Sequence, residues 1–264
     1  PAPNGMGFPD GDFTQQFFIF RSIAFQQFTS GHFPLWANCF FGGYPFHADP
    51  QSQLFYPPVW ITFSAVRLLG FSDFPLIALT IETISHYLAI SVFAYLFLRE
   101  ESGSRIAALV GALVLSYGGY LTGYPPLQTS VIETATWMPL LLLALRRFSI
   151  SGSGRAAAVT VSVYAVAFLA GHPQTFLLVT YLSMGYFLFR ARSAGRGWAW
   201  ILLWLLVIVA LVLLVISTQL LPQTQFLHLS TRTSLPFDQL ARGFVPQDIV
   251  QFVLTKLGSN DLWQ

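Results

Sequence analysis

The sequence predicts an all-α polytopic membrane protein: a helix bundle with about six transmembrane helices, and further interfacial helices that lie along the membrane surface. Composition is the first reason. Hydrophobic residues make up 54% of the 264 residues and charged residues only 9%, with a mean hydropathy of +0.60. Ordinary soluble domains carry about 25% charged residues, so a soluble globular domain is excluded. The other two reasons are the long apolar runs and the short Arg-rich connections that separate them.

Six segments are long and apolar enough to cross a membrane, which takes roughly 20 residues of helix. They cover residues 74–98, 104–123, 127–147, 155–170, 174–190 and 198–221. The connections between them alternate between Arg-rich and Arg-free. We therefore expect a transmembrane bundle of six helices over residues 74–221.

The Arg-rich connections give the bundle an orientation. Eight of the 13 basic residues lie in three connections: Arg99, Arg105, Arg146, Arg147, Arg155, Arg190, Arg192 and Arg196. The positive-inside rule makes these connections cytoplasmic, so the basic residues indicate topology and not nucleic-acid binding. The connections near 123–128 and 170–175 contain no Lys or Arg, and we expect them outside. By the same alternation, residues 1–73 and 222–264 are external.

Residues 1–73 are expected to form an external first loop with two interfacial helices. Residues 54–70 are apolar but too short to cross, and residues 13–30 are amphipathic and rich in Phe. We expect the aromatic residues to face lipid or the headgroup region. An external N-terminus implies a helix before Pro1, so the sequence reads as a piece of a longer chain. The single cysteine, Cys39, excludes an internal disulfide.

Two carboxylates of the first loop are candidates for chemistry. Asp12 has Gln16 four residues on, so both lie on one helix face. In a structural interpretation, Asp12 is a helix N-cap. In a functional interpretation, it is a general base or a metal ligand beside a phosphate. Asp49 precedes Pro50, which is typical of a turn, and its structural and functional interpretations both stay open.

Other ionisable residues lie at the expected external end of the bundle. Glu82 and His86 are four residues apart and are expected to share a hydrogen bond, while Glu133 is a candidate second acid. His172 lies in the turn GHPQ, together with Gln174, and is either structural or a phosphate ligand. No nucleotide-binding, dinucleotide-binding, HExxH or CxxC motif is present.

The order of these motifs resembles one known family. The sequence contains DFTQQ, then HFPLWANCFFGGYPFHADPQSQLFYPP, TATWMPLLLLALRR, LAGHPQT and QLLPQTQFLHLSTR. This order is similar to that of the bacterial YfhO-like membrane proteins, which are related to the GT-C class of polyprenyl-phosphate-dependent glycosyltransferases. The resemblance implies a GT-C-like multi-pass protein of the bacterial inner membrane. It also implies a catalytic Asp in the first external loop, and Asp12 occupies that position.

The resemblance thus implies a glycosyltransferase that moves a sugar from a polyprenyl-phosphate donor to an acceptor on the external face. Asp12 is the expected base. The expected donor-binding residues are Gln16, Asp49, His172, Gln174 and Arg232. A divalent cation, Mg²⁺ or Mn²⁺, is a candidate cofactor without assigned ligands. The main alternative is a non-catalytic GT-C-like subunit of a larger membrane complex; a secondary transporter would require inverted repeats, which the sequence lacks.

Overall fold

The computed structural model describes residues 11–40, 42–123 and 125–230, and helices account for nearly all of their regular structure. The described residues contain no β-strand; they have one isolated antiparallel bridge, between Ala37 and Tyr44. The predicted all-α class is therefore confirmed. The chain divides into two compact units, Pro1–Phe226 and Leu227–Gln264, and the account below concerns the first.

Both helices expected in the first loop are present. A short π-helical turn, η1 (Phe13–Phe17), continues directly into α1 (Phe18–Thr29). Two single 3₁₀ turns follow, η2 (Phe46–Ala48) and η3 (Pro50–Ser52). Helix α2 (Pro57–Leu68) then begins with two prolines, which the first helical turn accommodates because its amides have no partner inside the helix.

Six hydrophobic segments were expected beyond residue 73, and each coincides with a helix. These helices are α3 (Leu76–Ser102), α4 (Arg105–Tyr117) with α5 (Gly119–Thr122), α6 (Thr129–Ser151), α7 (Gly154–Leu169), α8 (Pro173–Ser193) and α9 (Trp198–His228). The second segment is interrupted between α4 and α5 at Gly118, whose backbone is extended. Glycine is a weak helix former, and Gly118 and Gly119 are adjacent at this break.

Three of these segments are long and apolar enough to cross a membrane: Leu76–Ser102, Arg105–Thr122 and Trp198–His228. They indicate a membrane protein. Helix α7 is apolar but has only 16 residues. Helix α6 is less apolar because it carries Thr, Ser, Glu and Arg side chains, and most of its residues are buried between α3, α7 and α8. A helix enclosed by other helices has little surface to present to lipid.

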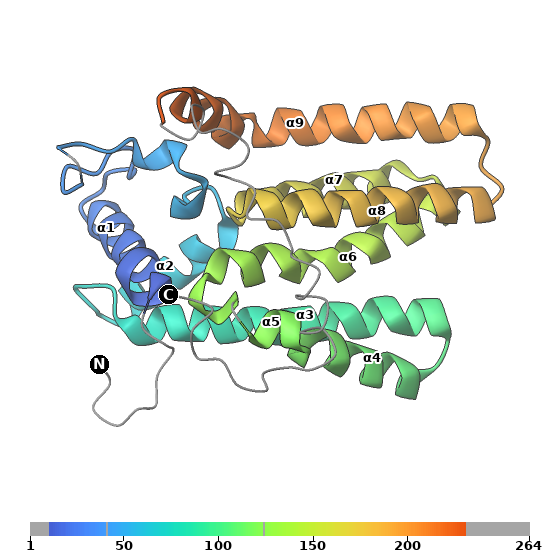
Figure 1. The fold of residues 1–264 in the computed structure, drawn as a ribbon, viewed down its shortest axis with the longest axis horizontal. Helices are drawn as coiled ribbons and strands as arrows, with labels where there is room; N and C mark the ends of the chain where they lie inside the picture. Colours follow the sequence, from blue (N-terminus) through green and yellow to red (C-terminus); the bar gives the residue numbers. More distant parts are fainter. Residues whose placement is uncertain (1–10, 41, 124, 231–264) are drawn as a thin grey trace, which may run out of the picture. The chain divides into compact units, whose positions relative to one another are not determined.

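The helices alternate in direction. In Figure 1, α3, α6 and α8 begin at the end where α1 and α2 lie, and all three Arg-rich connections lie at the opposite end. Two of the helices that follow these connections are capped by serine: Ser104 before α4 and Ser153 before α7 each accept a hydrogen bond from a backbone amide three residues on, at 3.3 Å. Such N-caps satisfy amides that have no partner within the helix.

At the Arg-rich end, the only two acids of these connections join three helices. Arg146 of α6 binds Glu100 and Glu101 of α3, each at 3.0 Å, and Arg147 also pairs with Glu100. Arg190 of α8 lies 3.6 Å from Glu101. Individual exposed pairs contribute about 0–1 kcal/mol, but here the charges form one network that holds the C-terminal ends of α3, α6 and α8 together.

The interior contains two main apolar clusters. One joins α1, α2 and the start of α3, and its buried phenylalanines are Phe13, Phe17, Phe20, Phe25, Phe46, Phe63 and Phe74. Their rings meet largely edge to face, for example Phe20 and Phe46 at 5.0 Å. The other cluster lies between α6, α7, α8 and α9. The expectation that the aromatic residues mainly face lipid is therefore wrong for the first loop, where they form the core.

Candidate functional site

Asp12, the expected base, lies at the start of η1 and is partly buried. Its side chain makes no capping hydrogen bond to the helix, so the N-cap interpretation does not hold. Instead, Oδ2 of Asp12 accepts a hydrogen bond from Nε2 of Gln128, at 2.9 Å. Gln128 directly precedes α6, so this contact fixes the carboxylate at the end of the bundle that we expect to be external.

Gln16 and Asp49 meet at one residue, Gln51. Nε2 of Gln16 donates to Oε1 of Gln51 at 2.7 Å, and the backbone amide of Gln51 donates to Oδ1 of Asp49 at 2.8 Å. The hydroxyl of Tyr44 donates to the other Asp49 oxygen at 2.7 Å. Asp49 therefore caps η3, as the turn interpretation predicted, and both of its oxygens are occupied.

Gln53, directly after η3, connects this loop to three other parts of the fold. Its Oε1 accepts from Nη2 of Arg21 at 2.5 Å. Its Nε2 donates to the carboxylate of Glu133 and to the backbone oxygen of Ala170. Gln53 has a left-handed backbone (φ 56°), which non-glycine residues rarely adopt. These buried hydrogen bonds hold it in that conformation.

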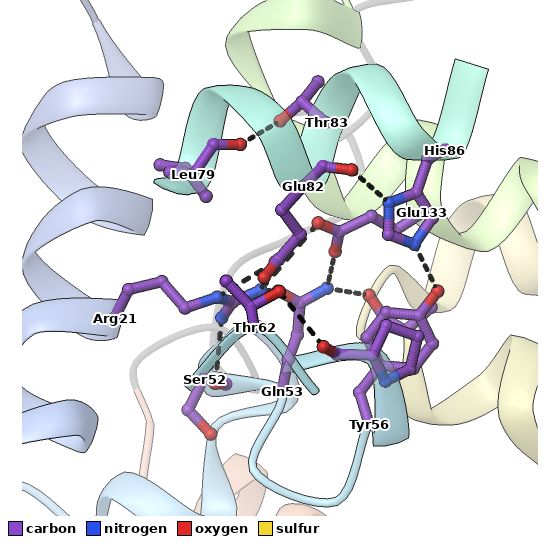
Figure 2. Close-up of polar contacts among 12 residues, drawn as sticks. Arg21, Ser52, Gln53, Tyr56, Thr62, Leu79, Glu82, Thr83, His86 and Glu133 are labelled. Carbon is purple, nitrogen blue, oxygen red and sulfur yellow. Dashed lines mark hydrogen bonds and ion pairs between the residues drawn. The ribbon is translucent and has the colours of Figure 1, made fainter. Parts of the chain in front are cut away.

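Arg21 forms the centre of the most deeply buried charge cluster among the described residues. Its Nε and Nη2 donate to Oε1 of Glu82, at 3.2 and 2.8 Å, and Nη2 lies 3.8 Å from Oε1 of Glu133. All three side chains are at most 1% exposed. Figure 2 shows α1, α3 and α6 each contributing one of them, with Gln53 between. Burial lowers the pKa of Arg21, but the two carboxylates outweigh it and raise the pKa above its usual value.

A second chain of hydrogen bonds adjoins this cluster. His86 Nδ1 donates to the backbone oxygen of Glu82 at 2.7 Å, which leaves Nε2 to accept from the Tyr56 hydroxyl, also at 2.7 Å. That hydroxyl in turn accepts from Trp137 Nε1 at 2.9 Å. Burial is the main reason that the pKa of Tyr56 lies well above its usual range. The expected Glu82–His86 contact therefore exists, but it uses the Glu82 backbone and leaves the carboxylate for Arg21.

The turn that contains His172 lies against the same loop. Gly171 has a φ of +87°, and a Cβ there would collide with the backbone oxygen of Pro50 and lie 2.9 Å from Cγ of Gln53. His172 is half-buried and caps α8: Nδ1 accepts from the backbone amide of Thr175 at 3.1 Å. Burial lowers its pKa. Gln174 lies next to it and is exposed, and Arg232 lies outside the described residues.

Most of the predicted residues thus converge on one loop, residues 49–53. Asp49 is part of this loop and binds the amide of Gln51. Gln16 contacts the loop through Gln51, Glu133 through Gln53, and the His172 turn through Gly171. Sequence reasoning missed Arg21 and Gln53. One signal was available for Arg21: two acids in apolar helices need a cation, and few Arg residues lie outside the three Arg-rich connections.

The chemistry open to these residues differs with their access to solvent. Asp12 is partly exposed and can accept a proton from a bound hydroxyl, whereas Glu82 and Glu133 are enclosed. No group of three or more His, Cys, Asp or Glu side chains in the described part of the chain could hold a metal ion.

Comparison of the chain with family models, with curated proteins and with solved structures finds no match.

Proposed function

We propose that this protein is a membrane glycosyltransferase that moves a sugar from a polyprenyl-phosphate donor to an acceptor on the non-cytoplasmic face. One observation carries the proposal. Asp12 is a partly exposed carboxylate, fixed by Gln128, at the end of the bundle where the Gln16, Asp49 and His172 segments converge. Six membrane-crossing helices, with α1 and α2 along the external surface, are part of this proposal.

In the proposed reaction, Asp12 takes the proton of the acceptor hydroxyl. The acceptor oxygen forms a bond to the anomeric carbon with inversion, while the bond from that carbon to the phosphate oxygen breaks. The lipid phosphate leaves with the electron pair of that bond. A group that receives a proton must lie within hydrogen-bond reach of it, and the partial exposure of Asp12 permits such an approach.

The leaving phosphate needs a positively charged or hydrogen-bonding partner. Arg232 and His172 are the proposed partners. A guanidinium binds two phosphate oxygens in a planar fork, and neutral His172 has Nε2 available because Nδ1 caps α8. Gln174, exposed beside His172, is a further hydrogen-bonding group for the donor.

The test uses the full chain in proteoliposomes with polyprenyl-phosphate sugars radiolabelled in the sugar, and a cell-envelope extract as acceptor. Removing a general base costs about 10²–10⁴ in rate, so Asp12→Asn should lose transfer by this factor while keeping its helix content. Asp73→Asn is the matched control, because Asp73 is an exposed acid of the same region. Near-normal transfer by folded Asp12→Asn protein would assign the base elsewhere.

A second candidate is a non-catalytic subunit of a larger membrane complex. One observation favours it: two grooves among the described residues are lined by residues of α6 and α7 and by residues 26–38, and neither of these two includes Asp12. Folded wild-type protein that turns over none of the donors in the same assay would support this candidate.

A further inference from the structure

A groove between α6 and α7 lies at the Arg-rich end of the bundle, away from Asp12. Its volume is about 290 Å³. Its apolar wall consists of Leu140, Leu143, Ala144, Ala156 and Val159. Val159 is 52% exposed, so the groove is open to the surroundings of the helices along this wall. A groove lined in this way accepts a hydrocarbon chain.

The polar rim of the groove consists of Arg147, Ser153 and Arg155. Arg155 is exposed, and no hydrogen bond or ion pair engages it among the described residues. Arg147 pairs with Glu100 through Nε and Nη2, which leaves Nη1 free to donate. Two guanidinium groups thus flank one end of an apolar groove.

The backbone adds to this positive rim. Ser153 caps α7 by accepting from the amide of Ala156, while the first amides of a helix have no partner within it. A helix of 16 residues presents a partial positive charge at this end. An anion beside Arg155 would therefore meet guanidinium groups and backbone amides together.

We propose that this groove binds an anionic phospholipid, with one acyl chain along the apolar wall and the phosphate between Arg147 and Arg155. The pairing of an apolar wall with a basic rim matches the two parts of such a lipid. Basic pockets between transmembrane helices on the cytoplasmic side are suited to anionic headgroups, and the Arg-rich connections are the ones expected on that side. The lipid site rests on the six-crossing arrangement proposed above, but it does not depend on sugar transfer.

The experiment uses the full chain in nanodiscs of phosphatidylcholine that contain a minority of phosphatidylglycerol. Native mass spectrometry then measures the ratio of the two lipids retained by the protein. Wild-type protein should retain phosphatidylglycerol in preference to phosphatidylcholine. One Arg near an anionic lipid contributes about fivefold in affinity, so Arg155→Gln should lower the preference by about this factor.

Arg105→Gln is the matched control. Arg105 is also exposed and follows an N-cap serine, Ser104, at the start of α4, but it does not line the groove. Its replacement should leave the preference unchanged. Val159→Trp tests the apolar wall: a Trp side chain fills the groove, so retention of bound lipid should fall. Arg105, Arg155 and Val159 are all exposed, and circular dichroism checks the helix content of each variant.

Three results would overturn the proposal. Equal retention of the two lipids by the wild type would remove the anionic specificity. An equal loss with Arg105→Gln and Arg155→Gln would assign the preference to the surface charge of the whole cytoplasmic end. Unchanged lipid retention in Val159→Trp would place the lipid outside this groove.

Discussion

Arg21 links the first loop to two helices of the bundle through buried charges. It lies in α1, in the first loop, yet its guanidinium is enclosed between Glu82 of α3 and Glu133 of α6. Oε1 of Glu133 has no hydrogen-bond partner among the described residues and lies 3.8 Å from Nη2 of Arg21. A single cation therefore compensates two acids, and Glu82 is the one that it binds directly.

Arg21→Met should destabilise the protein strongly, because it leaves two buried carboxylates without their cation. Removing one partner of a buried pair costs about 3–5 kcal/mol. Glu133→Gln should cost much less than Glu82→Gln, since an amide oxygen still accepts from Gln53 and the Arg21–Glu82 pair remains. Thermal unfolding in detergent, followed by circular dichroism, measures all three. An equal loss with Glu82→Gln and Glu133→Gln would contradict this assignment.

His172 should make stability depend on pH. Its pKa is lowered by burial from the usual 6.5, and its Nδ1 must be unprotonated to cap α8. The relevant pH window runs from 6.5 down to the lower pKa of His172 in the folded protein. Within this window the unfolded chain binds the proton before the folded protein does. The stability that the neutral His172 cap contributes is therefore complete above pH 6.5 and is lost as the pH falls through the window. His172→Asn keeps a capping oxygen without titrating. The difference in melting temperature between the two proteins should therefore change across this window, and a constant difference would contradict the prediction.

At the scale of elements, the first loop is attached to the bundle by close backbone contact as well as by charge. Gly171 lies in the middle of the α7–α8 turn, and its positive φ and the absence of a side chain allow the turn to approach Pro50. Ala170 O accepts from Gln53 beside it. The turn between two bundle helices thus forms one surface against which η3 packs.

Gly171→Ala should destabilise the protein more than Gly195→Ala. Both glycines have a positive φ, +87° and +79°, but a Cβ at Gly195 meets nothing within 4 Å. The control therefore measures the backbone cost alone, about 1–2 kcal/mol, whereas Gly171→Ala adds a collision with the backbone of Pro50. Denaturation of the two variants under identical conditions gives the comparison. Equal losses would mean that the close approach to Pro50 contributes nothing.

At the scale of the whole molecule, the three Arg-rich connections lie at one end and the first loop at the other (Figure 1). The positive-inside rule predicts that the Arg-rich end is cytoplasmic. Ion pairs at the Arg-rich end also bring these connections together, because Glu100 and Glu101 at the end of α3 bind arginines near the ends of α6 and α8. The number of crossings and the side of each connection remain predictions.

Cysteine labelling tests this orientation. In a Cys39→Ser background, Ser72→Cys should react with a membrane-impermeant maleimide from outside the cell, and Ser151→Cys only after the membrane is opened. Both positions are exposed in the structure, so access to solvent does not limit either reaction. Labelling of Ser72→Cys from the cytoplasmic side alone would reverse the orientation and remove the support for an external Asp12.

The sequence by itself determined the helices and their order. Length and composition of an apolar run are local properties, so each of the six segments and both first-loop helices were predicted, most with ends within a few residues. The exception is α9, which continues through Pro222 to His228, past the expected end at residue 221. The break at Gly118 was not predicted, because two glycines lower helix propensity without fixing where a helix stops. The capping role of Asp49 was also readable, since it depends on the next two residues.

Only the tertiary structure decided which of these residues meet. Arg21 looked like one polar residue of a surface helix, and its partner Glu82 lies 61 residues away in the chain. The phenylalanines of the first loop appeared suited to lipid, but they form a core because α1 and α2 fold onto the start of α3. Contacts of this kind depend on how distant segments pack, and hydrophobic or charged character alone does not identify the partner of a buried side chain.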